Sequence, residues 1–204
     1  MEDDRPLLEW GVAGWTMQGE AESGDLAVVQ RFDGGALAAV VDGLGHGREA
    51  ARAAKAAVRV LRRFAGEPLD RLVERSHEAL RVTRGAVMSI ACFRAGTDTM
   101  SWVGVGTVEA RLVTADGGEG PPHHSMIPQA GIVGYNLPAV HPSDLQVRRG
   151  DTLIFITDGV RSDVAQDADV STSPKELARR ILAEGSKGTD DALVLVTRYL
   201  GDGD

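Results

Sequence analysis

Most apolar residues of this chain fall in short runs bounded by turn residues, a pattern typical of β-strands. The runs at 26–32 and 36–41 predict a strand pair, because the turn Asp33-Gly34-Gly35 separates them. A turn at 149–151 is expected to join two later strands, 146–148 and 152–157. The other predicted strands are 10–16, 87–94, 100–106, 109–114 and 192–199.

Three other segments repeat their apolar residues at helical spacing, at 48–64, 69–82 and 174–184. The first is rich in alanine, which has the highest helix propensity. For the third, Ser173 is a suitable N-cap and Gly185 a suitable stop. The residues predicted to face inward from the first two helices are Ala50, Ala54, Ala57, Leu61, Phe64, Leu69, Leu72, Val73 and Leu80.

The order of these elements predicts the fold class. The strands come in hairpin-like groups, and the helices come as a pair and then singly, which is not the alternation of a parallel α/β fold. We therefore predict an α+β fold with antiparallel sheets. No linker or internal repeat interrupts the 204 residues, so one domain over 1–204 is expected. The segment 115–125 is expected to be a loop and the tail 201–204 to be disordered.

Composition and charge narrow the range of partners and compartments. The formal net charge is −8, which argues against nucleic acid and anionic membranes as partners, because both require a basic surface. No secretory signal and no apolar stretch long enough to cross a bilayer is found, so a cytoplasmic location is expected. The single cysteine, Cys92, cannot form an internal disulfide, and it has no basic partner beside it that would favour a role as nucleophile.

Aspartates stand at one end of four apolar strands. Asp25 and Asp42 lie at the start and the end of the predicted hairpin. Asp158 follows a later strand, and Asp190 with Asp191 precedes the last one. An acid at the start of one strand and an acid at the end of its antiparallel neighbour fall on the same sheet edge. The hairpin supports this arrangement for the first pair, and symmetry extends it to Asp158 and Asp190.

Such a cluster of carboxylates favours a divalent cation. Neighbouring carboxylates repel and raise one another's pKa, a cost that a cation removes. Ligation by oxygen alone selects Mg²⁺ or Mn²⁺ over zinc, and two such ions can clamp a phosphoryl group. Gly43, Gly45 and Gly47 directly after Asp42 allow the backbone to turn and to approach a bound group. The alternative that each aspartate only caps a turn stays open.

The aspartate motifs also resemble those of a known family. The motifs are Gly24-Asp25, Asp42-Gly43-Leu44-Gly45-His46-Gly47, Thr157-Asp158-Gly159-Val160 and Thr189-Asp190-Asp191-Ala192. In this order they resemble the metal-binding motifs of PPM-type serine/threonine protein phosphatases, in the bacterial SpoIIE branch. The segments that resemble the small RsbX-like phosphatases are His77-Glu78-Ala79-Leu80, Thr83-Arg84-Gly85-Ala86-Val87, Gly104-Val105-Gly106 and Gly131-Ile132-Val133-Gly134-Tyr135.

The resemblance implies a fold and a metal site. The fold would be a sandwich of two antiparallel β-sheets between helices. Asp42 would bridge two Mn²⁺ or Mg²⁺ ions, and the carbonyl of Gly43 would complete one coordination shell. Asp158 and Asp190 would hold one ion and Asp25 would act at the other, which makes Asp42 and Asp158 the catalytic pair. Asp191 matches a more variable acid or amide beside the ligands and is counted with the metal set.

The resemblance also implies a reaction, in which a metal-bridging hydroxide attacks a phosphoserine or phosphothreonine directly. The substrate class it implies is a phosphorylated STAS-domain protein of a stress-signalling complex. Two features depart from larger relatives. Leu44 stands where those relatives carry a histidine that is thought to protonate the leaving group. No residue matches the arginine that grips phosphate in them.

Two other functions remain open from the sequence: a phosphatase-like module that binds a signalling partner without catalysis, and a hydrolase of small phosphoesters. The oligomeric state is not indicated. Among the histidines, His46 is interpreted as a turn or outer residue of the site, and His77 as a hydrogen-bonded core residue. His123 and His124 are interpreted as part of a solvated loop.

Overall fold

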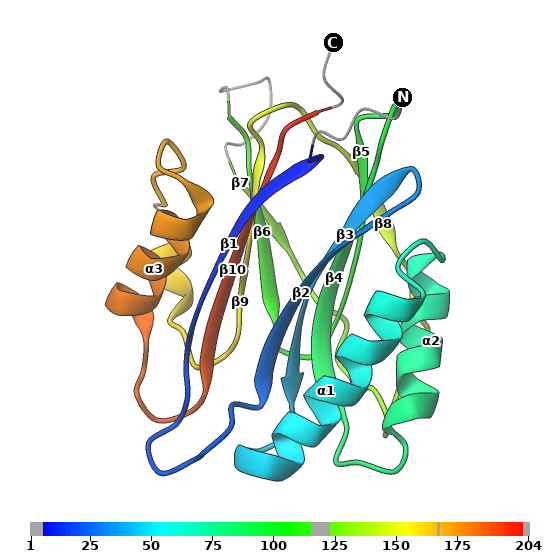
Figure 1. The fold of residues 1–204 in the computed structure, drawn as a ribbon, viewed down its shortest axis with the longest axis vertical. Coiled ribbons are helices and arrows are strands. Elements are labelled where there is room, and N and C mark those ends of the chain that lie inside the picture. Colours follow the sequence, from blue (N-terminus) through cyan, green and yellow to red (C-terminus); the bar gives the residue numbers. More distant parts are fainter. Residues whose placement is uncertain (1–5, 116–122, 167, 202–204) are drawn as a thin grey trace.

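The computed structural model describes residues 6–115, 123–166 and 168–201, and within them ten strands form two five-stranded antiparallel sheets (Figure 1). The first sheet has the order β1 (Leu8–Trp15), β10 (Ala192–Tyr199), β9 (Thr152–Ile156), β6 (Glu109–Val113) and β7 (His123–Met126). The second sheet has the order β2 (Asp25–Phe32), β3 (Gly35–Gly43), β4 (Ala86–Arg94), β5 (Thr99–Val105) and β8 (Ser143–Gln146).

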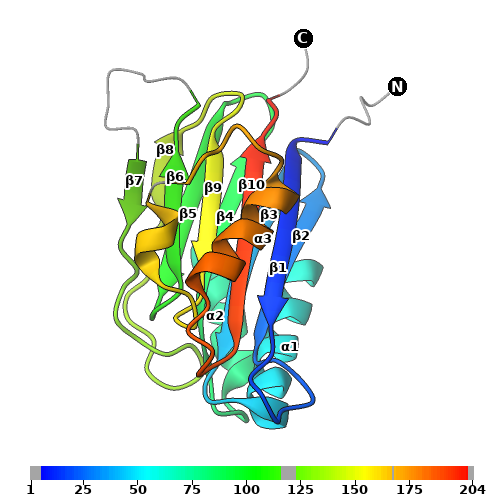
Figure 2. The same ribbon diagram turned by 90° about the vertical axis from the view of Figure 1, so that its left-hand side faces the viewer.

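Helices cover the outer faces of this sandwich. Helices α1 (Gly47–Arg63) and α2 (Leu69–Leu80) pack on the second sheet, whereas α3 (Pro174–Gly185) packs on the first sheet against β1 and β10 (Figures 1 and 2). A short 3₁₀ turn, η1 (Ser162–Ala165), lies beside α3. The prediction of two antiparallel sheets between helices is confirmed.

The continuous apolar run of β3 is explained by burial on both of its faces. Leu37, Ala39 and Val41 belong to the core between the second sheet and its helices. Ala38 and Val40 point the other way, into the core between the two sheets. A strand covered on both sides loses the usual alternation of apolar and polar residues, so β3 reads as an uninterrupted hydrophobic segment.

The predicted helices agree closely with the structure. The Ser173 hydroxyl caps α3 by accepting a hydrogen bond from the Glu176 amide. Of the face predicted for α1, Ala50, Ala54, Ala57 and Leu61 are fully buried. The second helix ends at Leu80 rather than at residue 82.

Two predictions about the strands are corrected. The strand expected at 146–148 is β8, which ends at Gln146 and pairs with β5, so it forms no hairpin with β9. Between them the chain crosses from one sheet to the other, and the Asp151 carboxylate holds the crossing by accepting from the amides of Arg148 and Ala115. Part of the expected loop 115–125 is strand β7, which pairs with β6.

Residues 116–122 of that loop and residues 202–204 of the tail lie outside the described residues. In the described part of the chain, no helix combines the length and the hydrophobicity that a membrane crossing requires.

Candidate metal centre

The β2–β3 hairpin brings the first two predicted acids together. Asp25 and Asp42 are partners in the strand register, so they lie side by side at the open end of the hairpin. The residues beside them are also joined, because the Gly43 amide donates a 3.0 Å hydrogen bond to the carbonyl of Gly24. The sequence-based pairing of Asp25 with Asp42 is confirmed.

The second pair lies at the same end of the other sheet. Strands β9 and β10 are antiparallel neighbours, with Ile156 opposite Val194. Asp158 therefore follows β9 at the end where Asp190 precedes β10. The sequence led us to expect all four acids at one sheet edge, and this expectation is corrected because the two pairs belong to different sheets. They occupy corresponding ends of two facing sheets, at the end of the sandwich opposite the chain termini (Figure 1).

Burial and mutual repulsion raise the pKa values of the two hairpin carboxyls, Asp25 and Asp42. Burial, with smaller contributions in the same direction from the charges of Asp25, Asp158 and Asp190, raises the pKa of Asp42 to about 9. Burial raises the pKa of Asp25 to about 7, although a hydrogen bond with Thr157 opposes this shift. Asp25 is only 5% exposed, and its Oδ2 atom has no hydrogen-bond partner among the described residues.

The loop acid of the first sheet is less strongly perturbed. Asp158 is exposed, and its pKa is raised by partial burial and by Asp190, while the Lys187 ammonium acts in the opposite direction. Lys187 lies close because its Nζ atom donates a 2.6 Å hydrogen bond to the carbonyl of Asp158. Sequence reasoning missed Lys187, which is 29 residues away along the chain.

The buried Asp191 carboxylate ties the β1–β2 connection to the start of β10. Its Oδ1 accepts from the Met17 amide at 2.8 Å, and its Oδ2 accepts from the Gly24 amide at 2.7 Å. Gly24 directly precedes Asp25, so this clamp helps to fix the backbone at one end of the acid cluster. Each oxygen keeps a second lone pair, and ligation of a metal by Asp191 stays a prediction.

A pocket of about 430 Å³ opens beside the acids. Asp42, Asp158 and Asp190 lie along its wall, together with residues of the β3–α1, β5–β6 and 130–132 segments. Leu44, which stands where larger relatives carry a histidine, lines the same pocket and makes this part of its wall apolar. The lining residues are Asp42, Leu44, Gly45, Val87, Gly106, Thr107, Ala130, Gly131, Ile132, Asp158 and Asp190.

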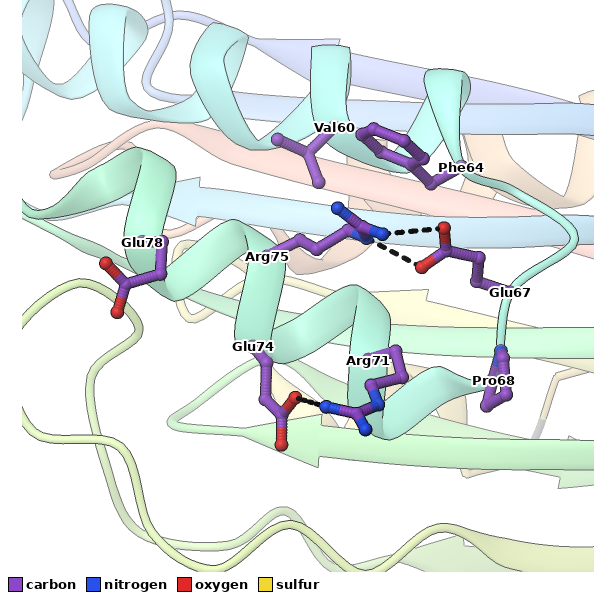
Figure 3. A pocket seen from close by; sticks show the side chains of 8 residues that line it. All are labelled: Val60, Phe64, Glu67, Pro68, Arg71, Glu74, Arg75 and Glu78. Atoms are coloured by element: carbon purple, nitrogen blue, oxygen red, sulfur yellow. Dashed lines mark hydrogen bonds and ion pairs between the residues drawn. The ribbon is translucent and has the colours of Figure 1, made fainter.

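A larger cavity, of about 760 Å³, lies away from these acids between α1 and α2. Figure 3 shows Arg75 reaching toward Phe64 and forming an ion pair with Glu67. A second ion pair joins Arg71 to Glu74 along the exposed face of α2. These charges neutralise one another locally and no carboxylate of the metal set takes part, so we assign no chemistry to this cavity.

The remaining candidates behave as structural residues. His46 is the N-cap residue of α1, and its Nδ1 lies 2.6 Å from Glu20 Oε1. His77 accepts a hydrogen bond from the Gly134 amide at 3.0 Å, which confirms the predicted hydrogen bond, but the residue is half-buried and does not belong to the core. Cys92 is buried, and burial raises the pKa of its thiol, as expected for a core residue and not for a nucleophile.

The donor chemistry at this end of the sandwich fits a hard divalent cation. The predicted donors are all oxygens, and the partnerless Asp25 Oδ2 is a buried polar atom that a cation would satisfy. Among the described residues, no three Asp, Glu, His or Cys side chains are grouped so that they hold a metal as they stand. Asp158 and Asp190 are both exposed, and Asp190 Oδ1 accepts a 2.8 Å hydrogen bond from the Asp191 amide, so ligation of an ion by Asp190 through this oxygen would compete with that bond.

Comparisons with known proteins identify the family and the fold of the chain. The family model for Stage II sporulation protein E (SpoIIE) matches residues 33–200. A search of curated proteins found no match.

Several solved structures share the fold. A chain from work on the bacterial stressosome, "a modular system that has been adapted to control secondary messenger signaling", is 30% identical with a TM-score of 0.85, and the match covers 94% of this chain and 99% of that one. RsbX in complex with magnesium is 21% identical with a TM-score of 0.84, over 97% of this chain and 98% of that one.

A third solved structure with this fold contains manganese. The catalytic domain of the serine/threonine protein phosphatase PstP, in complex with two manganese ions, is 18% identical with a TM-score of 0.71, and the match covers 95% of this chain and 98% of that one. The SpoIIE model spans most of the sequence, including the Asp42, Asp158 and Asp190 motifs. The chain therefore belongs to the SpoIIE family of PPM-type, metal-dependent serine/threonine protein phosphatases.

Proposed function

We propose that this chain removes phosphate from phosphoserine or phosphothreonine on a signalling protein, using two Mn²⁺ or Mg²⁺ ions held at the acid cluster. Asp25, Asp42, Asp158, Asp190 and the carbonyl of Gly43 are the proposed ligands, with Asp191 beside them. The observation that carries the proposal is the convergence of buried or half-buried carboxyls with raised pKa values beside a pocket of about 430 Å³.

The residues of the chain have separable roles in this proposal. When bound, the ions lower the pKa of a water molecule and neutralise charge on the phosphoryl group. Asp42 is paired with Asp25 in the hairpin and lines the pocket together with Asp158 and Asp190, so it is the residue that would hold both ions. Asp158 and Asp190 approach from the other sheet, so that closure of the site depends on the packing of the two sheets. The raised pKa values indicate that the carboxyls need a cation in order to ionise fully.

The proposed substrate is a phosphorylated STAS-domain protein of bacterial stress signalling. It is supported by the similarity to the stressosome-associated chain at 30% identity and by the fold shared with RsbX. The net charge of −8 is consistent with a protein substrate and not with a nucleic acid. A cytoplasmic location, where such substrates occur, stays a prediction of the sequence.

Phosphate release from purified phospho-STAS proteins, measured with Mn²⁺ and with chelator, tests this proposal. We expect turnover with Mn²⁺, none with chelator, and loss of turnover in Asp158→Asn with the fold retained. Asp33→Asn is the matched control, because Asp33 is exposed in the β2–β3 turn at the opposite end of the hairpin. Full activity of Asp158→Asn, or activity in chelator, would contradict the proposal. Hydrolysis of small phosphoesters alone, or metal-free partner binding alone, would select one of the two other functions.

A further inference from the structure

The Arg84 side chain lies against the loop that follows Asp42. Its Nη1 atom is 2.9 Å from the position that a Cβ on Gly45 would occupy. Gly45 lines the pocket that also contains Asp42 and Asp158. Gly45 has φ +90°, and a side chain there would also displace the guanidinium. The absence of a side chain at residue 45 therefore makes room for Arg84 at the edge of the pocket.

The backbone around Arg84 is held in place from both sides. The Thr83 hydroxyl donates to the carbonyl of Leu80 at 2.7 Å and accepts from the Gly85 amide at 3.0 Å. The carbonyl of Gly85 accepts from the Leu44 amide at 3.1 Å, which joins the α2–β4 turn to the loop after Asp42. These bonds fix the main chain on each side of residue 84, so the Arg84 side chain extends from a defined backbone position beside the loop that follows Asp42.

The charge of Arg84 is free to bind an anion. Arg84 is exposed, and within 6–115, 123–166 and 168–201 it forms no ion pair. The other cation near the pocket, Lys187, already donates to the carbonyl of Asp158. Arg81, three residues earlier, is paired with Glu78 at 3.4 Å. Arg84 is thus a cation beside Gly45 whose side chain has no ion pair among the described residues.

We propose that Arg84 is the residue that binds the phosphate group of the substrate at the mouth of the acid-lined pocket, an inference that rests on the proposed phosphatase function. A guanidinium offers two parallel N–H donors that match two phosphate oxygens. Arg84 lies against Gly45, and Gly45 lines the pocket together with Asp42 and Asp158, so the guanidinium is close enough to the acid cluster for one phosphate group to contact both the arginine and the ions that those acids would hold. It also supplies the phosphate-binding cation for which the sequence offered no match.

The proposal is tested on the full chain with Mn²⁺ by measuring three quantities for Arg84→Ala, Arg84→Gln and Arg84→Lys. These are KM and kcat for p-nitrophenyl phosphate, the inhibition constant of inorganic phosphate, and the Mn²⁺ affinity by calorimetry. For the Ala and Gln variants we expect KM and the phosphate inhibition constant to rise about tenfold to a hundredfold, as for lost hydrogen bonds to a charged group. Arg84→Lys is expected to recover only part of this loss, since lysine lacks the planar fork.

Arg81→Ala is the matched control, because it removes the same charge from the same segment without approaching the pocket. We expect it to leave all three quantities unchanged, and we expect Mn²⁺ affinity to be unchanged in every variant. Wild-type phosphate inhibition in Arg84→Ala, an equal effect of Arg81→Ala, or a parallel fall in Mn²⁺ affinity would overturn the assignment. If the wild-type chain hydrolyses nothing, the proposed function fails, and calorimetric binding of inorganic phosphate to the Mn²⁺-loaded variants still decides the role of Arg84.

Discussion

Replacing Asp191 with asparagine separates an anchoring role of this carboxylate from a role as metal ligand. The two oxygens of Asp191 accept from the Met17 and Gly24 amides at 2.8 and 2.7 Å, and the residue is only 3% exposed. Asparagine keeps one acceptor oxygen but turns its NH₂ group toward the other amide. One backbone N–H is then left without an acceptor in a site that water reaches poorly.

The magnitude follows from these contacts. A buried donor that loses its partner costs about 1–3 kcal/mol of unfolding free energy. In the opposite direction, removing the charge of Asp191 relieves repulsion of Asp25 and Asp42, but burial and not Asp191 is the largest cause of both raised pKa values. We therefore expect a net loss of about 1–3 kcal/mol, or about 2–4 °C in Tm for each kcal/mol in a chain of this size.

Urea unfolding in the presence of chelator measures this loss without any contribution from bound metal. Asp33→Asn serves again as the control, because it makes the same chemical change at an exposed residue at the far end of the hairpin. Calorimetry of Mn²⁺ binding completes the experiment. If Asp191→Asn unfolds like the wild type in chelator yet loses Mn²⁺ affinity as Asp158→Asn does, the anchoring role is refuted and Asp191 is a ligand.

Three further predictions concern pH, the site backbone and the core. The folded-state pKa values of Asp25 and Asp42, about 7 and about 9, lie above the usual 3.8, so the metal-free protein should lose stability as the pH rises from about 4 to about 9. Saturating Mn²⁺ should flatten this pH profile of Tm. A metal-free Tm that rises over this range would be inconsistent with such burial. In Gly159→Ala the new Cβ would lie 1.9 Å from the carbonyl oxygen of Asp191, so we expect the unfolding free energy to fall by about 1–3 kcal/mol and Mn²⁺ to bind more weakly. Thermal unfolding and calorimetry measure these two quantities, and wild-type values in both would argue against this packing. Leu61→Ala removes a fully buried side chain of α1 and should cost about 2–5 kcal/mol in urea unfolding, whereas a loss below about 1 kcal/mol would show that this core adjusts freely.

Local patterns were enough to predict most elements and half of the acid cluster. The hydrophobic run of 192–199 coincides with β10, and the alanine-rich segment after Gly47 coincides with α1. The Asp33-Gly34-Gly35 turn fixes the register of a two-stranded hairpin, and this places Asp25 opposite Asp42. These features depend on neighbours close in the sequence, so periodicity and turn chemistry are sufficient to predict them.

Strand order and long-range partners could not be predicted in the same way. The prediction for β8 was wrong because an antiparallel strand followed by a turn favours a hairpin, whereas here β8 pairs with β5 in the other sheet. The sequence suggested the pairing of Asp158 with Asp190 by symmetry alone. In the structure this pairing results from the direct pairing of β9 with β10, which α3 separates in the sequence. No local signal indicates which of several compatible strands will be neighbours, because that choice depends on the packing of the whole core.

The amino-acid pattern thus specifies the strands, the helices and the presence of acids at strand ends, because each depends on burial and turn preferences within a few residues. The meeting of two sheet ends, the Asp191 clamp on Met17 and Gly24, and the placement of Arg84 beside Gly45 arise only in the folded chain. For the first and third of these features the reason is that tertiary packing decides which distant segments meet, and for the Asp191 clamp it is also that a buried polar group must find partners wherever packing brings them. Those partners lie up to 174 residues apart along the chain.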